Sequence, residues 1–461
     1  MPSLSYLLPF AVAASASFRF ASRRSPATPR AALLASAAPD AAAERDRLLF
    51  DSLLASHAVT ASVRLAGGAF HPRGRTLLAA ADLSAGAALL RVPAALLLTA
   101  HRSGACAGLH GQTELLWAEV GDLREEAGEA AFRRGMTWDV RLALALLDAT
   151  AGAGGEFWLR YRALLPPPAA VSHPLCLPPP LRAELRDAAV AAAAEARARL
   201  LHSLAPGLRA HGCHPATAAY EALGAPAELV PRPLEYAYAL VASRCFATAD
   251  EHTFAFVPFA DLCQHAARPN ANFSSEDGGF VLRALRAIGE GEEVTICYGE
   301  EYSSSRFFAQ YGFAPEEGCA KDSAMLQALV PEADAAGDER VAAARAAEPR
   351  TPLGASPLGM QALMRVFDEM KECEYASEPR FAAILEALLA EDGPSPHVLL
   401  AAVTWRLEQL DCSARELDEG IEELQQQQPL DLRTIAVLSY RAVVAKQLEL
   451  TQRVLSKLLN D

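Results

Sequence analysis

The spacing of apolar residues changes several times along the chain, and these changes predict the order of the secondary structure. Helical spacing covers Ala41 to Leu54, and short apolar runs separated by turns then predict strands over Val63 to Val92. Helical spacing returns over Thr113 to Leu208, most clearly in Trp138 to Leu147 and Leu181 to Leu201. The first half of the chain therefore reads as a β segment followed by helices.

Strand-like segments resume at Thr253 to Val257, Phe280 to Ala284 and Glu293 to Tyr298, with glycine turns between them. Pro331 to Gly359 is rich in Ala, Pro and Glu, which predicts a linker or a surface loop. Met360 to Leu459 has mostly helical spacing. The fold class is therefore α+β, with a β-rich unit that is split by a helical insertion and followed by an all-α C-terminal domain.

The predicted domain boundaries follow these changes of pattern. A presequence covers residues 1–40, and the two parts of the β-rich unit cover 41–105 and 236–318, on either side of a helical insertion over 106–235. A linker over 319–359 leads to the helical C-terminal domain over 360–461.

The N-terminal segment has the composition of a targeting sequence. Met1 to Pro39 contains no acidic side chain and is rich in Ser, Ala and Arg. This composition predicts an organelle transit peptide, and the hydroxyl-rich start favours the chloroplast (plastid stroma) over the mitochondrion. Leu7 to Ala14 is a short apolar run that a secretory signal would also contain, but no charged segment precedes it, and the odd cysteine count disfavours export.

Composition and charge limit the partners. The chain of 461 residues is 51% hydrophobic and has a formal net charge of -14, so it has no overall basic field to hold a nucleic-acid backbone. The acidic balance suits a basic polypeptide, although ordinary solubility is the simpler explanation for it. No stretch predicts a membrane span. The nine cysteines form no C-x-x-C pair, which argues against a zinc site and for thiols in a reducing compartment.

The candidate chemistry lies in four short motifs between Phe256 and Phe313. The motifs are F-V-P-F-A-D-L-C-Q-H over 256–265, N-A-N-F over 270–273, G-E-E-V-T-I-C-Y-G over 291–299 and Y-G-F over 311–313. In this order and spacing they resemble the C-terminal half of SET domains, in which an Asn-His loop and a G-E-E…Y-G strand thread together around the cofactor.

Other segments extend the resemblance from roughly Ala61 to the C-terminus. Gly74 to Gly86 looks like the opening hairpin of the SET fold, and Ser243 to Phe246 looks like the segment that resumes the fold after the insertion. The aromatic run Phe157 to Pro166 and the C-terminal helices are similar to plant Rubisco large-subunit methyltransferase and its relatives. The resemblance implies a SET-domain protein-lysine methyltransferase that uses S-adenosylmethionine. Its partner would be a lysine-bearing protein, Rubisco or another stromal protein, with no nucleic acid and no membrane.

Methyl transfer from a sulfonium to an amine is an in-line displacement, so the protein must align the reactants, exclude water and stabilise a neutral lysine amine. This chemistry requires no metal. The resemblance implies that Tyr298 is the catalytic hydroxyl, placed between the methyl donor and the amine. It also implies contacts to the cofactor from Arg73, Gly74, Arg75, Arg244, Gln264 and His265, and contacts to the substrate from Phe246, Asp261 and Tyr311.

Several of these residues have a structural alternative. In the structural alternative, Tyr298 is only an aromatic residue that closes a strand, and Tyr311 packs in the core. Arg244 would form a structural ion pair and not bind the carboxylate of the cofactor. Asp261 would fix its own loop, and His265 would contribute mainly through its main chain.

Two residues depart from the family pattern. Gln264 stands where Asn is usual, and Thr76 replaces a common Gly in the opening turn, where a positive φ would disfavour a β-branched side chain. These departures leave open a non-catalytic SET-fold binding or assembly factor. A histidine-directed methyltransferase is a further alternative, although Phe246 is apolar and offers no polar group to orient an imidazole.

Overall fold

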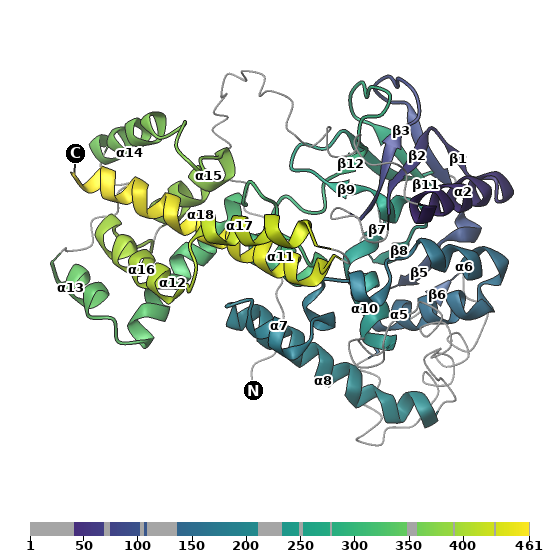
Figure 1. The fold of residues 1–461 in the computed structure, drawn as a ribbon, viewed down its shortest axis with the longest axis horizontal. Coiled ribbons are helices and arrows are strands. Elements are labelled where there is room, and N and C mark those ends of the chain that lie inside the picture. Colours follow the sequence, from purple (N-terminus) through teal and green to yellow (C-terminus); the bar gives the residue numbers. More distant parts are fainter. Residues whose placement is uncertain are drawn as a thin grey trace. The chain divides into compact units, whose positions relative to one another are not determined.

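The computed structural model describes residues 41–68, 74–101, 106–107, 136–210, 233–248, 252–276, 279–347, 357–390, 392–427 and 430–460 (Figure 1). The predicted presequence, the predicted cofactor contact Arg73 and part of the helical stretch after Thr113 lie outside these ranges. Within them, no helix has the length and apolar character needed to cross a membrane.

Helix α2 (Ala41–Ser56) confirms the helical spacing at the start of the described chain. Two sets of short strands follow it, one on each side of the helical insertion. The first set is β1 (Thr60–Ala61), β2 (Val63–Gly67), β3 (Arg75–Ala79), β4 (Ala88–Val92), β5 (Leu98–His101) and β6 (Cys106–Ala107). The second set is β7 (Cys245–Ala247), β8 (Thr253–Phe256), β9 (Gln264–His265), β10 (Ala271–Glu276), β11 (Gly279–Ala284) and β12 (Thr295–Ile296).

Strands from the two sets share sheets. Two antiparallel sheets have the orders β1-β4-β11-β10 and β6-β5-β8-β7, and β2 and β3 form a hairpin. β4 ends at Val92, because Pro93 has no N–H to continue the ladder. Since β4 pairs with β11 and β5 with β8, one β-rich unit is indeed split by a helical insertion, as the sequence predicts.

One strand pair is parallel and brings distant segments together. β9 pairs with β12, with Gln264 opposite Thr295 and His265 opposite Ile296. The residues before β12 also lie against β3, because the N–H of Val294 donates to the carbonyl of Leu77 over 2.8 Å. The loop after β8, the strand before Tyr298 and the opening hairpin therefore lie side by side.

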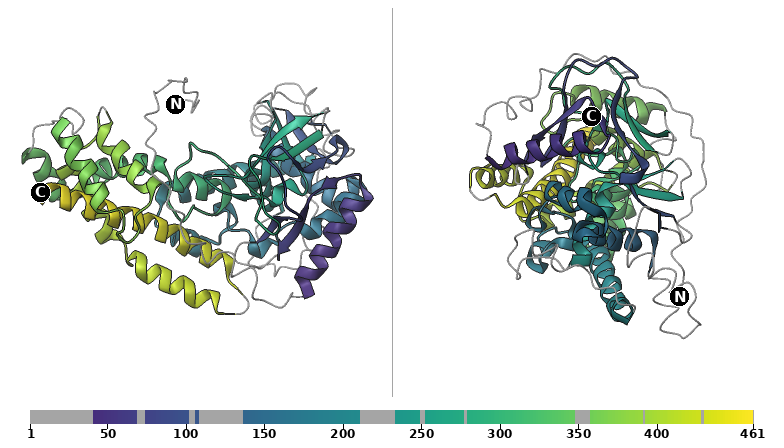
Figure 2. Two further views of the ribbon diagram at one scale, coloured as in Figure 1. Left: turned by 90° about the horizontal axis from the view of Figure 1, so that it is seen from above. Right: turned by 90° about the vertical axis from the view of Figure 1, so that its right-hand side faces the viewer.

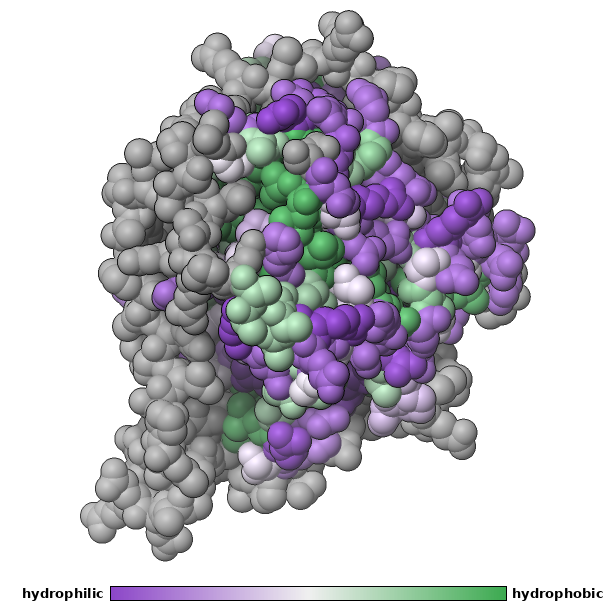
Figure 3. Space-filling view, turned by 90° about the vertical axis from the view of Figure 1, so that its left-hand side faces the viewer, coloured by the Kyte–Doolittle hydropathy of each residue, from purple (hydrophilic) through white to green (hydrophobic). Residues whose placement is uncertain are grey.

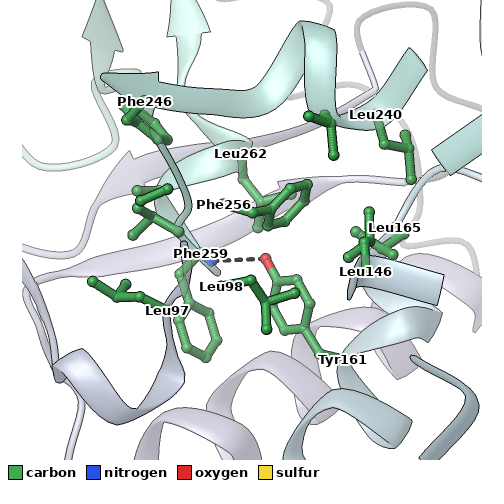
Figure 4. Packing of buried hydrophobic residues seen from close by; sticks show 14 of the residues in the cluster. Leu97, Leu98, Leu146, Tyr161, Leu165, Leu240, Phe246, Phe256, Phe259 and Leu262 are labelled. Atoms are coloured by element: carbon green, nitrogen blue, oxygen red, sulfur yellow. Dashed lines mark hydrogen bonds between the residues drawn. The ribbon is translucent and has the colours of Figure 1, made fainter. Parts of the chain in front are cut away.

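Helices of the insertion pack against these sheets. They are α5 (Trp138–Asp148), α6 (Gly155–Tyr161), α7 (Pro179–Ala183), α8 (Ala188–Ala210) and α10 (Pro233–Arg244). The aromatic run at α6 is buried, and the rings of Trp158 and Tyr161 contact Phe256 and Phe259 respectively. Figure 4 shows Tyr161, Phe256 and Phe259 in one cluster with leucines from the strands and from the insertion. The insertion and the β-rich unit thus share a core.

The region expected to be a linker is helical in its described part. The composition of Pro331 to Gly359 predicts a loop, and this prediction is wrong, because α12 (Ser323–Ala335) runs through Pro331 and α13 (Glu339–Ala347) follows it. Leu326, Ala333 and Val341 are fully buried in the core of the C-terminal helices. Apolar residues at three- and four-residue spacing determine the structure here, and the Ala- and Glu-rich composition obscures them.

The C-terminal region is helical, as the sequence predicts. Its further helices are α14 (Pro357–Glu369), α15 (Glu378–Leu389), α16 (Pro396–Gln409), α17 (Ala414–Gln425) and α18 (Leu432–Asn460), whereas α11 (Ser304–Tyr311) follows β12 in the β-rich unit. Ser377, Ser395 and Ser413 begin α15, α16 and α17, and each hydroxyl accepts a hydrogen bond from a main-chain N–H of the first turn. Helix α18, yellow in Figure 2, contacts α16 and α17. The face in Figure 3 is hydrophilic over most of its described surface, with apolar residues between.

Candidate active site

Tyr298 follows β12, and its side chain is partly buried. The phenol donates a hydrogen bond of 2.5 Å to the main-chain carbonyl of Cys263, and the main-chain N–H of Tyr298 donates to Nδ1 of His265 over 3.2 Å. Burial raises the pKa of Tyr298 above its ordinary value, although the positive charge of Arg244 opposes the change. Tyr298 is therefore a neutral phenol of fixed orientation.

Aromatic rings surround this phenol. The ring centroid of Tyr298 lies 4.8 Å from that of Tyr311, 5.4 Å from His265 and 6.1 Å from Phe313. Phe307 contacts His265, Tyr311 and Phe313. We call these five residues, His265, Tyr298, Phe307, Tyr311 and Phe313, the aromatic group. It combines residues of the Q-H loop, the Y-G strand end and the Y-G-F motif with Phe307 of the helix between the last two.

Helix α11 and the turn after it place three members of the aromatic group, Phe307, Tyr311 and Phe313. The helix begins at Ser303, whose hydroxyl accepts from the N–H of Arg306, and it ends at Gly312, which has a φ of 76°. A Cβ at Gly312 would lie 2.6 Å from the main-chain nitrogen of His173, so only glycine fits there. The hydroxyl of Tyr311 donates to the main-chain oxygen of Tyr298 over 3.1 Å, which ties the helix to the strand end.

His265 is neutral over the physiological pH range. Burial lowers the pKa of His265 to about 4, although a main-chain hydrogen bond at Ile296 acts in the opposite direction. Its Nδ1 accepts the hydrogen bond from Tyr298, so the proton of the neutral ring lies on Nε2. A sulfonium methyl donor would bring a positive charge to this position, and the neutral imidazole beside the phenol adds no second one.

Asp261, in the loop after β8, forms an ion pair with Arg244 at the end of α10. The carboxylate of Asp261 is fully buried and accepts from the phenol of Tyr161 over 2.5 Å and from Nη1 of Arg244 over 3.3 Å. The same Nη1 donates to the main-chain oxygen of Asp261 over 2.8 Å. Burial raises the pKa of Asp261, while Arg244 and Tyr161 act in the opposite direction. These contacts favour the loop-fixing alternative for Asp261, whereas the side chain of Arg244, 24% exposed, reaches the surface.

Gly74, Arg75 and Gln264 meet at the opening hairpin. The side-chain amide of Gln264 donates to the main-chain oxygen of Arg75 over 2.9 Å. The guanidinium of Arg75 forms an ion pair with Asp46 of α2 over 2.7 Å and donates to the carbonyls of residues 163, 164 and 165 in the insertion. The main chain of Arg75, and not its side chain, therefore faces Gln264.

Thr76 does not occupy a turn, so the expectation of strain at this position is wrong. It lies within β3, is buried, and its hydroxyl donates to Oε1 of Glu293 over 2.8 Å. The positive φ angles of the hairpin belong to Gly67 and Gly74. A β-branched residue suits a strand, so Thr76 gives no reason to expect a damaged site.

Phe246 lies in β7 and is nearly buried. Its ring contacts Phe273 and Phe280, with centroids 5.0 and 4.9 Å away. Among the described residues no ring contact joins it to the aromatic group, so the structure places this predicted substrate contact in a separate aromatic cluster.

Sequence reasoning missed one polar group of the site. The sequence gives Tyr161 no role beyond its place in the aromatic run Phe157 to Pro166, yet its hydroxyl bonds both Asp261 and the main-chain N–H of Phe259. The aromatic run could have indicated such a contact, because the hydroxyl of a buried Tyr generally needs a hydrogen-bond partner. Within the described ranges no three His, Cys, Asp or Glu side chains are placed to hold a metal ion.

Comparison with known proteins identifies the domain. Residues 74–299 match the family model of the SET domain, so this part of the chain is a SET domain, as its motifs predict. SET domain-containing protein 8 of Schizosaccharomyces pombe is 36% identical to the chain over 97 residues. That match covers 21% of this chain and 22% of the yeast protein, so the chain spans about a fifth of the curated relative.

Solved structures share the fold over a longer range. The SET domain of LSMT, in a structure bound to lysine and AdoHcy, covers 89% of this chain and 91% of its own, with 15% identity and a TM-score of 0.50. Rubisco LSMT bound to sinefungin and monomethyllysine covers the same shares, with 14% identity and a TM-score of 0.49. The first likeness shows that the fold is a SET fold with a helical C-terminal region.

Proposed function

We propose that this protein is a protein-lysine N-methyltransferase of the Rubisco large-subunit methyltransferase-like family. It would transfer methyl groups from S-adenosylmethionine to a lysine side chain of a protein substrate. The observation that carries the proposal is the phenol of Tyr298, held by the carbonyl of Cys263 at 2.5 Å beside the rings of the aromatic group. The structure of the similar LSMT domain contains lysine and AdoHcy, which supports the same pair of ligands here.

The residues near Tyr298 fit the chemistry of S-adenosylmethionine. The partly exposed guanidinium of Arg244 suits the carboxylate of the cofactor. Gly74 has open space around the position of a Cβ, which suits a close approach to its main chain. His265 and Gln264 would lie beside the adenine, and Arg73 completes the set of cofactor contacts that the resemblance implies. When bound, the cofactor supplies an electrophilic methyl group on a sulfonium.

The chain's own residues would orient and desolvate the amine. The proton of Tyr298 is directed to the carbonyl of Cys263, which leaves lone pairs of the phenol oxygen to accept a hydrogen bond from a neutral lysine amine. The face of Tyr311 would hold the cationic or methylated amine before and after transfer. Phe307 and Phe313 exclude water from the same place, which favours the neutral amine.

The proposed substrate is Rubisco or another lysine-bearing protein of the plastid stroma, with the mitochondrion as the alternative location. Two features of the sequence support this proposal. The chain has a net charge of -14, and the segment from Met1 to Pro39 is rich in Ser, Ala and Arg and has no acidic side chain. An acidic enzyme attracts a basic, lysine-bearing surface.

A calorimetric titration with S-adenosylmethionine tests the proposal against a binding or assembly factor. Gln264, in place of the usual Asn, is the remaining observation in favour of the latter, since Thr76 lies in a strand. An enzyme is expected to bind the cofactor saturably with one site per chain. A flat titration of the folded protein would instead favour the non-catalytic scaffold.

A further inference from the structure

Tyr161 links the helical insertion to the loop that carries Cys263. It is the last residue of α6 and is fully buried. Its phenol oxygen accepts from the main-chain N–H of Phe259 over 2.7 Å and donates to Oδ1 of Asp261 over 2.5 Å. Figure 4 shows the first of these bonds, with the phenol directed at the main chain of Phe259. One side-chain oxygen thus holds two residues of the same turn.

The turn that Tyr161 holds has an unusual conformation. Phe259 has a φ of 70°, which a bulky side chain rarely adopts. Its ring is buried and lies 5.3 Å from both the ring of Phe50 and the ring of Tyr161. Such a conformation persists only where neighbouring groups fix it, and the bond from the N–H of Phe259 to Tyr161 is one such constraint.

The turn leads directly to Cys263. A 3₁₀ turn covers Ala260–Leu262, and the N–H of Cys263 donates to the carbonyl of Ala260 over 3.0 Å. The direction of the Cys263 carbonyl therefore depends on the turn that begins at Phe259. This carbonyl is the acceptor for the phenol of Tyr298.

We propose that Tyr161 is a positioning residue for Tyr298, acting through the turn from Phe259 to Cys263. The inference rests on the proposed function, in which Tyr298 is the hydroxyl at the reacting centre. Loss of the Tyr161 hydroxyl lets the turn relax, moves the carbonyl of Cys263, and changes the orientation of the Tyr298 phenol. A buried tyrosine of the insertion would in this way determine the geometry of the active site without touching the substrate.

The test is a nuclear magnetic resonance measurement that needs no activity. Tyrosine labelled with ¹³C at Cζ gives one signal for each of the ten tyrosines, and the Tyr298 signal is assigned by its loss in Tyr298→Phe. In Tyr161→Phe the Tyr298 signal is expected to move. The matched control is Tyr238→Phe, because Tyr238 is also nearly buried and donates to a carboxylate, that of Asp139, over 2.7 Å. In this control the Tyr298 signal is expected to stay at its wild-type position.

An unmoved Tyr298 signal in a folded Tyr161→Phe protein would overturn the inference, and so would an equal movement in Tyr238→Phe. If Tyr161→Phe does not fold, Asp261→Asn tests the same link, because the amide N–H would face either the phenol or the guanidinium of Arg244. It is expected to move the Tyr298 signal, and no movement in this variant overturns the inference as well.

Kinetics add a second readout. Tyr161→Phe is expected to lower kcat roughly ten- to a hundredfold while leaving the KM for the cofactor unchanged, because a misplaced reacting group mainly affects the chemical step. In a Tyr298→Phe background the same substitution should have little further effect, since the group that it positions is gone. A wild-type protein without transferase activity would refute the proposed function but would leave the resonance test intact.

Discussion

The hydroxyl of Tyr298 donates a hydrogen bond of 2.5 Å to the main-chain oxygen of Cys263, a residue that precedes it by 35 positions. The bond joins the loop after β8 to the strand end after β12. The parallel pairing of β9 with β12 holds the same two segments together. The candidate active site therefore depends on the relative placement of these two segments.

Replacing Arg75 by Met should destabilise the whole SET domain. The substitution keeps much of the side-chain length but leaves Asp46 without its ion pair and the carbonyls of residues 163 to 165 without a donor. The free energy of unfolding in urea should fall by about 3 kcal/mol. Arg268→Met is the control, because the pair of Arg268 with Glu378 is exposed and should contribute no more than about 1 kcal/mol. Equal effects in the two variants would contradict this account of Arg75.

Two substitutions at Tyr311 separate its hydroxyl from its ring. Tyr311→Phe loses the hydrogen bond to the main-chain oxygen of Tyr298 and should lower the free energy of unfolding by about 1 kcal/mol. Tyr311→Leu also loses the aromatic face, so the KM for a lysine-bearing substrate should rise about tenfold, within the range of a cation–π contact. Steady-state kinetics on both variants test this. Equal KM values for the substrate in Tyr311→Phe and Tyr311→Leu would show that the aromatic ring does not contribute to substrate binding.

His265 should make the protein less stable as the pH falls from about 6.5 to about 4. Burial lowers the pKa of His265 to about 4 in the folded protein, whereas an unfolded chain has a value of roughly 6.5. Between these values the unfolded state binds the extra proton, so stability is lost as the pH falls and is regained as it rises. In His265→Asn the amide oxygen can still accept from the N–H of Tyr298.

The measurement for His265 is chemical denaturation of both proteins across this pH range. The stability advantage of the wild-type protein over His265→Asn should shrink towards pH 4. A difference that is constant with pH would show that this imidazole does not titrate between the two values.

The motif order was sufficient to predict the SET fold and to bring Tyr298, His265 and Tyr311 into one site. These motifs are short and follow one another along the chain, so their order and spacing predict the topology of the fold. Contacts between distant segments could not be predicted in this way. The guanidinium of Arg75 turns away from the site because its partners, the carboxylate of Asp46 in α2 and three carbonyls of the insertion, lie elsewhere.

The helix through Pro331 and the strand position of Thr76 were missed for related reasons. Composition suggests a loop around Pro331, but burial of Leu326, Leu329 and Ala333 stabilises a helix there. For Thr76, the family pattern suggests a turn, yet the register of β2 with β3 pairs it with Ala66. Tertiary packing and strand register decide both cases, and neither is visible in local sequence.

Gln264→Asn tests whether the longer side chain is a handicap. The amide of Gln264 reaches the main-chain oxygen of Arg75 over 2.9 Å, and Asn is one methylene shorter. Loss of this bond should lower the free energy of unfolding by about 1 kcal/mol without tightening cofactor binding, as measured by calorimetry. Tighter binding of S-adenosylmethionine by the Asn variant would show instead that Gln264 impairs the site.

The most direct measurement of the proposed activity follows labelled methyl groups. The protein from Ala41 onwards is incubated with labelled S-adenosylmethionine and a stromal extract, and mass spectrometry locates the label in the extract proteins. The wild-type protein should place the label on a lysine side chain, and Tyr298→Phe, which keeps the ring but loses the phenol oxygen, should reduce the rate about a hundredfold. Transfer by Tyr298→Phe at the wild-type rate, or a wild-type protein that binds the cofactor but labels no lysine, would contradict the account.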